Sequence, residues 1–95
     1  MYKLSNRAAD DFGSIYEYTW RQFGSEQADK YTLELDLFLS LLAKNPLAGR
    51  DVSEVINGVR RHDYRLHAIF YVQSEYGIFI IRILHQKMNP LLHLN

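Results

Sequence analysis

Hydrophobic and polar positions divide the 95-residue chain into a helix-forming first half and a strand-forming second half. From Ala8 to Phe23, and again from Ala28 to Leu42, apolar residues recur close to every 3.6 positions, which predicts two amphipathic helices. Ser5 precedes the first helix as a candidate N-cap. Gly24 should end that helix and Ser25 should cap the next. A connection this short predicts an antiparallel helical hairpin.

The second helix carries more apolar surface than its main stripe requires. Leu33, Leu37 and Leu41 form a second stripe beside the main one. Such a stripe either adds contact with the first helix or remains exposed as a docking surface for a partner.

The second half predicts three strands, at about residues 58–64, 67–73 and 77–85, separated by turn residues. Short turns between them favour an antiparallel meander, with residues 2–4 added at one edge. Residues 51–57 read as a short irregular link. The sequence therefore predicts a single α+β domain over residues 1–95, in which the helical hairpin packs on a small, mainly antiparallel sheet of three to four strands.

The last strand contains a charged residue within an apolar run. Side chains alternate between the two faces of a strand, so Phe79, Ile81 and Ile83 should meet the helices and Arg82 should face the other way. A guanidinium among isoleucines needs a partner. That partner is either an internal acid, for which Glu54, Asp63 and Glu75 are candidates, or an acidic amphipathic segment of another protein. The neighbouring basic residues Arg60, Arg61 and Arg65 would strengthen the positive potential.

Composition narrows the functional classes. The chain has no cysteine, which excludes disulfides and thiolate metal sites and suits a reducing compartment. The formal net charge is zero, which disfavours tight binding to bare nucleic acid. No apolar run approaches the roughly 20 residues of a membrane span, and no signal peptide is evident, so we expect a cytoplasmic protein. We expect no metal site, and no cofactor is implied.

The order of short motifs along the whole chain resembles the ParE toxins of the RelE/ParE superfamily of type II toxin–antitoxin systems. The matching segments are 8–11, 23–24, 67–71 and 80–85, followed by Met88-Asn89-Pro90 and His93-Leu94. Asn89 stands where many relatives carry Asp. The resemblance implies a toxin that inhibits DNA gyrase by binding rather than by catalysis, and a ParD-type antitoxin that wraps around it.

Two sets of residues follow as candidates. The contacts with the target should come from the end of the chain and from the tryptophan, if its side chain lies partly exposed: Arg82, His85, Met88, Asn89, Leu92, His93 and Trp20. The contacts with the antitoxin should come from the second leucine stripe and the arginines: Leu33, Leu37, Leu41, Arg60, Arg61, Arg65 and Arg82. For two of these segments the structural reading comes first, with Trp20 as a plain core anchor and residues 90–94 as a strap packed on the sheet edge. Contact with a partner is the alternative for both.

The alternative function is that of a ribosome-dependent mRNA endonuclease of the RelE branch. Metal-free RNA cleavage needs a base, an acid and cations around the phosphate. The candidates for these roles are Arg61, Arg65, Arg82, His85, Tyr64 and Glu54. The neutral net charge argues against this reading, because phosphate binding depends on several Lys or Arg contacts. A toxin-like fold that has lost its activity is the third possibility.

Overall fold

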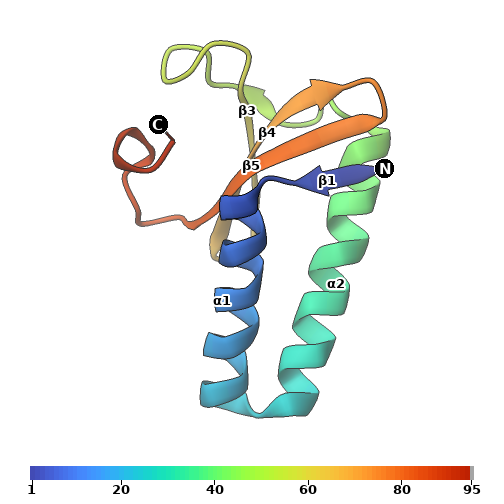
Figure 1. Ribbon diagram of the computed structural model, residues 1–95, viewed down its shortest axis with the longest axis vertical. Helices are drawn as coiled ribbons and strands as arrows, with labels where there is room; N and C mark the ends of the chain where they lie inside the picture. Colours follow the sequence, from blue (N-terminus) through green and yellow to red (C-terminus); the bar gives the residue numbers. More distant parts are fainter. Residues whose placement is uncertain (95) are drawn as a thin grey trace.

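The computed structural model describes residues 1–94, which form two helices packed on one five-stranded sheet (Figure 1). The helices are α1 (Asn6–Phe23) and α2 (Ser25–Lys44). The strands are β1 (Tyr2–Leu4), β2 (Arg50–Asp51), β3 (Arg60–Tyr64), β4 (His67–Ser74) and β5 (Gly77–His85), and the short 3-10 helix η1 (Pro90–Leu92) follows them. This arrangement confirms the predicted α+β class.

The strand order in the sheet is β1-β5-β4-β3-β2. Strands β2 to β5 pair as an antiparallel meander, and β1 adds to β5 in parallel, so the predicted edge position of β1 is confirmed. The two-residue strand β2 was not expected, because so short a segment has no alternation that a sequence could reveal.

The helix termini follow the predicted caps with one exception. Ser5 caps α1, and its side chain accepts a hydrogen bond from the Ala8 amide at 3.0 Å. Gly24, whose φ is +90°, ends α1 and also precedes α2 as its N-cap. Ser25 is therefore the first residue of α2 rather than its cap, and that prediction is wrong. A left-handed φ suits glycine, which reverses the chain between two helices without a longer loop.

The sheet separates two apolar clusters. The main core lies between the hairpin and the sheet and combines Leu35 and Leu39 of α2 with Ile69 and Tyr71 of β4, among other buried residues. A smaller cluster covers the other face, where Val52 and Val59 from the segment between β2 and β3, and Leu94 near the end of the chain, pack on the sheet residues Ala68, Phe70 and Leu84. Both faces of β4 and β5 are consequently covered, as their near-continuous apolar sequence requires.

A β-bulge in β5 changes the predicted assignment of side chains to faces. Phe70 pairs with Arg82 but Tyr71 pairs with Ile80, so Ile81 is an extra residue opposite the partner strand. Ile80 therefore belongs to the core beneath the helices, while Ile81 packs at the edge of the smaller cluster. Placing Ile81 on the helix face was wrong, and so was placing Phe79 there, since it pairs with Val72 of the opposite face. Ile83 lies beyond the bulge and does meet the helices.

A buried tyrosine fastens the loop that follows α2. The Tyr71 hydroxyl donates a hydrogen bond to the Pro46 carbonyl at 2.8 Å and accepts one from the Gly49 amide at 2.9 Å. A Cβ on Gly49 would lie 2.5 Å from that hydroxyl oxygen, so only glycine fits this approach. The loop is thereby fixed to the sheet just before β2 begins.

We predict that Tyr71→Phe lowers the free energy of unfolding by about 1–3 kcal/mol, because it leaves a buried amide and a carbonyl without their partner. Urea denaturation measures the change. The control is Tyr18→Phe, which removes a hydroxyl from an exposed side chain and should leave the unfolding midpoint in place. Equal midpoints for Tyr71→Phe and the wild type would show that the hydroxyl does not hold the loop.

Candidate functional site

The outer edge of β5 is completed by side chains where β1 ends. β1 pairs with β5 only from Ile78 to Ile80. Beyond that point the Ser5 hydroxyl donates to the Ile81 carbonyl at 2.7 Å, and the Asp11 carboxylate accepts from the Ile83 amide at 3.0 Å. The first turns of α1 therefore take over the hydrogen bonding that a longer strand would have supplied.

Arg82 finds its partner in Asp11. The guanidinium donates from Nε at 2.8 Å and from Nη2 at 2.9 Å to the two carboxylate oxygens, a bidentate pair in which the side chains are only 14% and 15% exposed. The hydrogen bond to Asp11 also raises the pKa of Arg82. An internal acid was one of the two predicted readings, but its candidates Glu54, Asp63 and Glu75 were wrong.

A signal for Asp11 was present in the sequence. Asp11 lies three residues after Ala8 and four before Ile15, which places its carboxylate on the apolar stripe of α1. An acid on a buried stripe needs a buried cation, and Arg82 was the one basic residue within an apolar strand.

The other three arginines of the predicted basic surface also have partners. Arg61 pairs with Asp63 at 2.8 Å, Arg65 pairs with Glu34 at 2.5 Å, and Arg60 donates to the Gly49 carbonyl at 2.6 Å. The register places Arg61 and Arg82 on either side of Phe70, so these two share a face of the sheet. The remaining two do not join them there, because Arg60 pairs with Tyr71 of the helix face and Arg65 lies in the β3–β4 turn.

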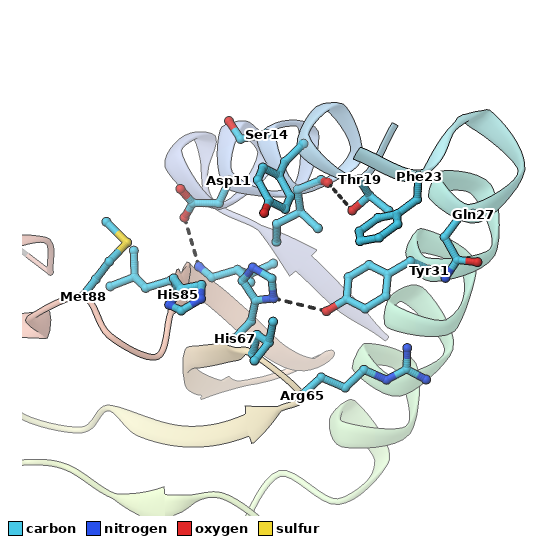
Figure 2. Close-up of a pocket in the computed structure, with 15 residues that line it drawn as sticks. Asp11, Ser14, Thr19, Phe23, Gln27, Tyr31, Arg65, His67, His85 and Met88 are labelled. Atoms are coloured by element: carbon cyan, nitrogen blue, oxygen red, sulfur yellow. Dashed lines mark hydrogen bonds between the residues drawn. The ribbon is translucent and has the colours of Figure 1, made fainter. Parts of the chain in front are cut away.

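A groove of about 580 Å³ opens on the helix side of the sheet, between α1, the beginning of α2 and the ends of β4 and β5 (Figure 2). Its walls are largely apolar and include Ile15, Phe23, Tyr31, Leu66 and Met88. Its size and composition are those of a site for a ligand or for the side chains of a partner.

A histidine pair lies in the groove. His67 and His85 are cross-strand partners whose ring centroids are 5.9 Å apart. The Tyr31 hydroxyl lies 3.2 Å from Nδ1 of His67, as the dashed line in Figure 2 shows. Burial lowers the pKa of His67, the charge of His85 lowers it further, and Asp11 partly opposes the shift. The pair therefore favours a neutral His67 at pH 7.

The predicted target contacts fall into separate places. His85 and Met88 line the groove. Leu92 lies exposed on η1, Asn89 caps η1 through its side chain, and the His93 carbonyl accepts from Arg82. Trp20 is 52% exposed on α1, so the prediction that it is a plain core anchor is wrong.

The stripe of Leu33, Leu37 and Leu41 is exposed, with each side chain more than half accessible. The prediction that these leucines add contact with α1 is therefore wrong, and the alternative, an exposed apolar stripe, is what the structure has.

The candidates for RNA cleavage do not converge on one place. Arg65 and His85 line the groove, whereas Arg61, Arg82, Tyr64 and Glu54 lie outside its lining. Among residues 1–94, no three His, Asp or Glu side chains gather into a group that could hold a metal ion. Neither helix in that part of the chain is long and apolar enough to cross a membrane.

Comparison with known proteins identifies a toxin family. Residues 2–90 match the family model described as the ParE toxin of the type II toxin–antitoxin system parDE. Toxin ParE1 of Caulobacter vibrioides is 37% identical over 93 residues, covering 98% of this chain and 96% of that protein. Toxin ParE1 of Mycobacterium tuberculosis is 35% identical over 89 residues, covering 93% of this chain and 91% of the relative.

A solved structure has the same fold. A chain of the structure titled as the chromosomal ParDE TA system from P. aeruginosa superposes with a TM-score of 0.75 at 25% identity, covering 88% of this chain and 92% of that one. Fold and sequence thus agree on a toxin of the type II toxin–antitoxin class. The chain belongs to the ParE toxin family.

We predict that the His67 side chain titrates below its ordinary value of about 6.5, and that His85→Gln raises the pKa of His67 by removing a neighbouring positive charge. NMR titration of the histidine ring protons measures both values. A His67 pKa that is the same in the wild type and in His85→Gln would contradict the electrostatic coupling of the pair.

The same shift predicts a pH dependence of stability. Because the folded-state pKa is lowered, the unfolded chain binds more protons near pH 6.5. The contribution of neutral His67 is fully present above about pH 6.5 and is lost as the pH falls towards the folded-state pKa. Compared with His67→Gln, the wild type should therefore lose more of its free energy of unfolding between pH 7.5 and pH 5. Urea titrations at the two pH values test this, and parallel losses in both proteins would contradict it.

Proposed function

We propose that this protein inhibits DNA gyrase and blocks replication, and that a ParD-type antitoxin neutralises it. The observation that carries the proposal is the match to the ParE toxin family over residues 2–90, together with the same fold in a ParDE system. A toxin of such a system has two partners, its antitoxin and its target, so the chain should present one surface to the antitoxin and one to gyrase.

The state of the arginines supports a binding role rather than RNA cleavage. Cleavage would need cations placed around one phosphate and a nearby acid and base. Here Arg82 is held by Asp11, Arg65 by Glu34 and Arg61 by Asp63. Moving any of them to a phosphate would break an existing pair.

The antitoxin surface in this proposal is the leucine stripe together with the groove. Leu33, Leu37 and Leu41 follow one another at intervals of four residues along the solvent side of α2, which suits the apolar face of a partner helix. The groove adds apolar walls, and Arg65 lines it with a half-exposed side chain that pairs with Glu34. An acidic side chain of the antitoxin would have to displace Glu34 from this pair, which costs little at an exposed site.

The target surface in this proposal is the end of the chain. Leu91 and Leu92 are 61% and 74% exposed on η1, and Met88, which lines the groove, lies two residues before η1. Apolar side chains left in water at a chain end are typical of a contact that a larger partner buries. Trp20 is also exposed, but it lies nine residues along α1 from Asp11, which is about two and a half helical turns. It therefore lies roughly 13 Å along the helix axis and on the opposite side of α1, outside this surface.

We predict that the purified wild-type protein stops supercoiling by gyrase and causes cleaved DNA to accumulate. Leu92→Asp should weaken inhibition by about tenfold or more, because it places a charge in an apolar contact without disturbing the core. The matched control is Leu47→Asp, an equally apolar and exposed position in the loop after α2, which should inhibit as the wild type does.

Undiminished supercoiling at a large excess of folded wild-type protein would reject gyrase as the target. Specific cutting of ribosome-bound mRNA during growth arrest would instead establish the nuclease function.

We predict that Leu37→Glu lowers the affinity for the ParD-type antitoxin by about tenfold or more, since binding would bury an unpaired carboxylate. Isothermal titration calorimetry measures the affinity, and Leu47→Glu is the control. Because Leu37 is exposed, circular dichroism should show both variants folded. Wild-type affinity in Leu37→Glu would remove the leucine stripe from the antitoxin surface.

A further inference from the structure

The end of the chain is attached to the sheet through few groups. We refer to residues 89–94 as the C-terminal strap. The amides of Leu92, His93 and Leu94 bond within the strap, to Asn89 and Pro90. Two features join the strap to the sheet: the buried side chain of Leu94, and a hydrogen bond of 2.9 Å from Arg82 Nη1 to the His93 carbonyl.

Arg82 reaches the strap because its other nitrogens are already fixed. Nε and Nη2 bind the Asp11 carboxylate in a fork, which leaves Nη1 directed at the His93 carbonyl. Asp11 is itself held by the Ile83 amide at 3.0 Å. One planar guanidinium thus connects α1, β5 and the strap, a geometry that the single ammonium of a lysine does not reproduce.

We propose that Asp11 and Arg82 form a clasp that orders the C-terminal strap and so presents Leu91 and Leu92. Arg82 is a positioning residue and not a contact with the target, since its side chain is only 14% exposed and each of its three guanidinium nitrogens is hydrogen-bonded. The ordering of the strap stands on the geometry alone. The use of the presented leucines against a target rests on the proposed function.

Leu91 and Leu92 are the exposed side chains whose position the clasp would fix. Leu91 and Leu92 contribute little to holding the strap, because they point into solvent while Leu94 packs in the smaller cluster. Leu94 and the His93 carbonyl attach the strap to the sheet, while Leu91 and Leu92 remain exposed. The contact surface is therefore ordered before binding, which reduces the conformational entropy lost on association.

Hydrogen exchange of the backbone amides tests the clasp directly. In Arg82→Lys, exchange at Leu92, His93 and Leu94 should quicken by about tenfold or more, because a hydrogen bond from a charged donor is lost. The core amides of β4 should keep their protection, which separates loss of the clasp from general destabilisation. The matched control is Arg21→Lys, the same change at an exposed arginine paired with Glu17, and strap exchange there should equal that of the wild type.

Asp11→Asn provides a second route to the same result, because it keeps the shape of the side chain but weakens the hold on Arg82. If neither variant folds, the exchange rate of the Arg82 guanidinium protons in the wild-type protein, measured by NMR, tests the clasp instead. The clasp requires these protons to exchange slowly with solvent. Unchanged strap exchange in a folded Arg82→Lys, or rapid guanidinium exchange in the wild type, overturns the clasp.

Growth arrest tests the presentation step. Arg82→Lys should raise the amount of protein needed for arrest by about tenfold. The double variant Leu91→Ser with Leu92→Ser should lose arrest as well while its strap amides stay protected. Full arrest by Arg82→Lys with a disordered strap would overturn the presentation role. Arrest that follows strap order without any effect on gyrase would reject the proposed target and leave the clasp intact.

Discussion

The short length of β1 is the constraint on which the rest of the structure depends. β5 is the second strand of the sheet, yet β1 covers only its first part, and the remaining edge would expose backbone groups next to the core. Ser5 and Asp11 complete that edge. Because Asp11 brings a carboxylate to a largely buried position, the strand must supply a cation, and Arg82 within the isoleucine run meets that need.

This arrangement also determines where binding surfaces form. α1 begins at the edge of the sheet and runs away from it, so the groove lies between the hairpin and the ends of β4 and β5 (Figures 1 and 2). The bulge at Ile81 turns Arg82 to the face opposite the helices. There Nη1, the nitrogen that does not bind Asp11, donates a hydrogen bond to the His93 carbonyl of the strap. The groove and the strap therefore lie on opposite faces of the sheet, both near the C-terminal end of β5.

The sequence predicted the elements well because each depends on a local signal. The Ser5 cap, the glycine of the hairpin, the period of the helices and the β-branched strands are all readable within a few residues, although the cap of α2 was placed one residue too late. The faces of β5 were predicted wrongly, since a bulge is set by pairing with β4 and has no mark in the sequence of Ile80-Ile81-Arg82. The partner of Arg82 lies 71 residues away, and only the position of Asp11 on an apolar stripe hinted at it.

The candidate residues show the same limit. Alternation and spacing identified Leu33, Leu37 and Leu41 as a surplus stripe, and the structure leaves them exposed. The sequence could not assign roles within the arginine set, because a role depends on which acid lies nearby in the fold. Arg82 was expected to meet either an internal acid or a partner, and in the fold its side chain is engaged by Asp11 and by the His93 carbonyl.

The amount of exposed apolar surface is large for so small a domain. The leucine stripe, Trp20 and the strap leucines together leave more apolar surface in water than a solitary domain of this size needs. The leucine stripe lies on the solvent side of α2, Trp20 lies on α1, and the strap leucines lie on η1, so the exposed apolar groups are spread over three elements. A partner that covers the stripe leaves the strap accessible. Under the proposed function, an antitoxin would therefore also have to cover or displace the strap, and the groove, whose lining includes Met88 just before the strap, offers a path towards it.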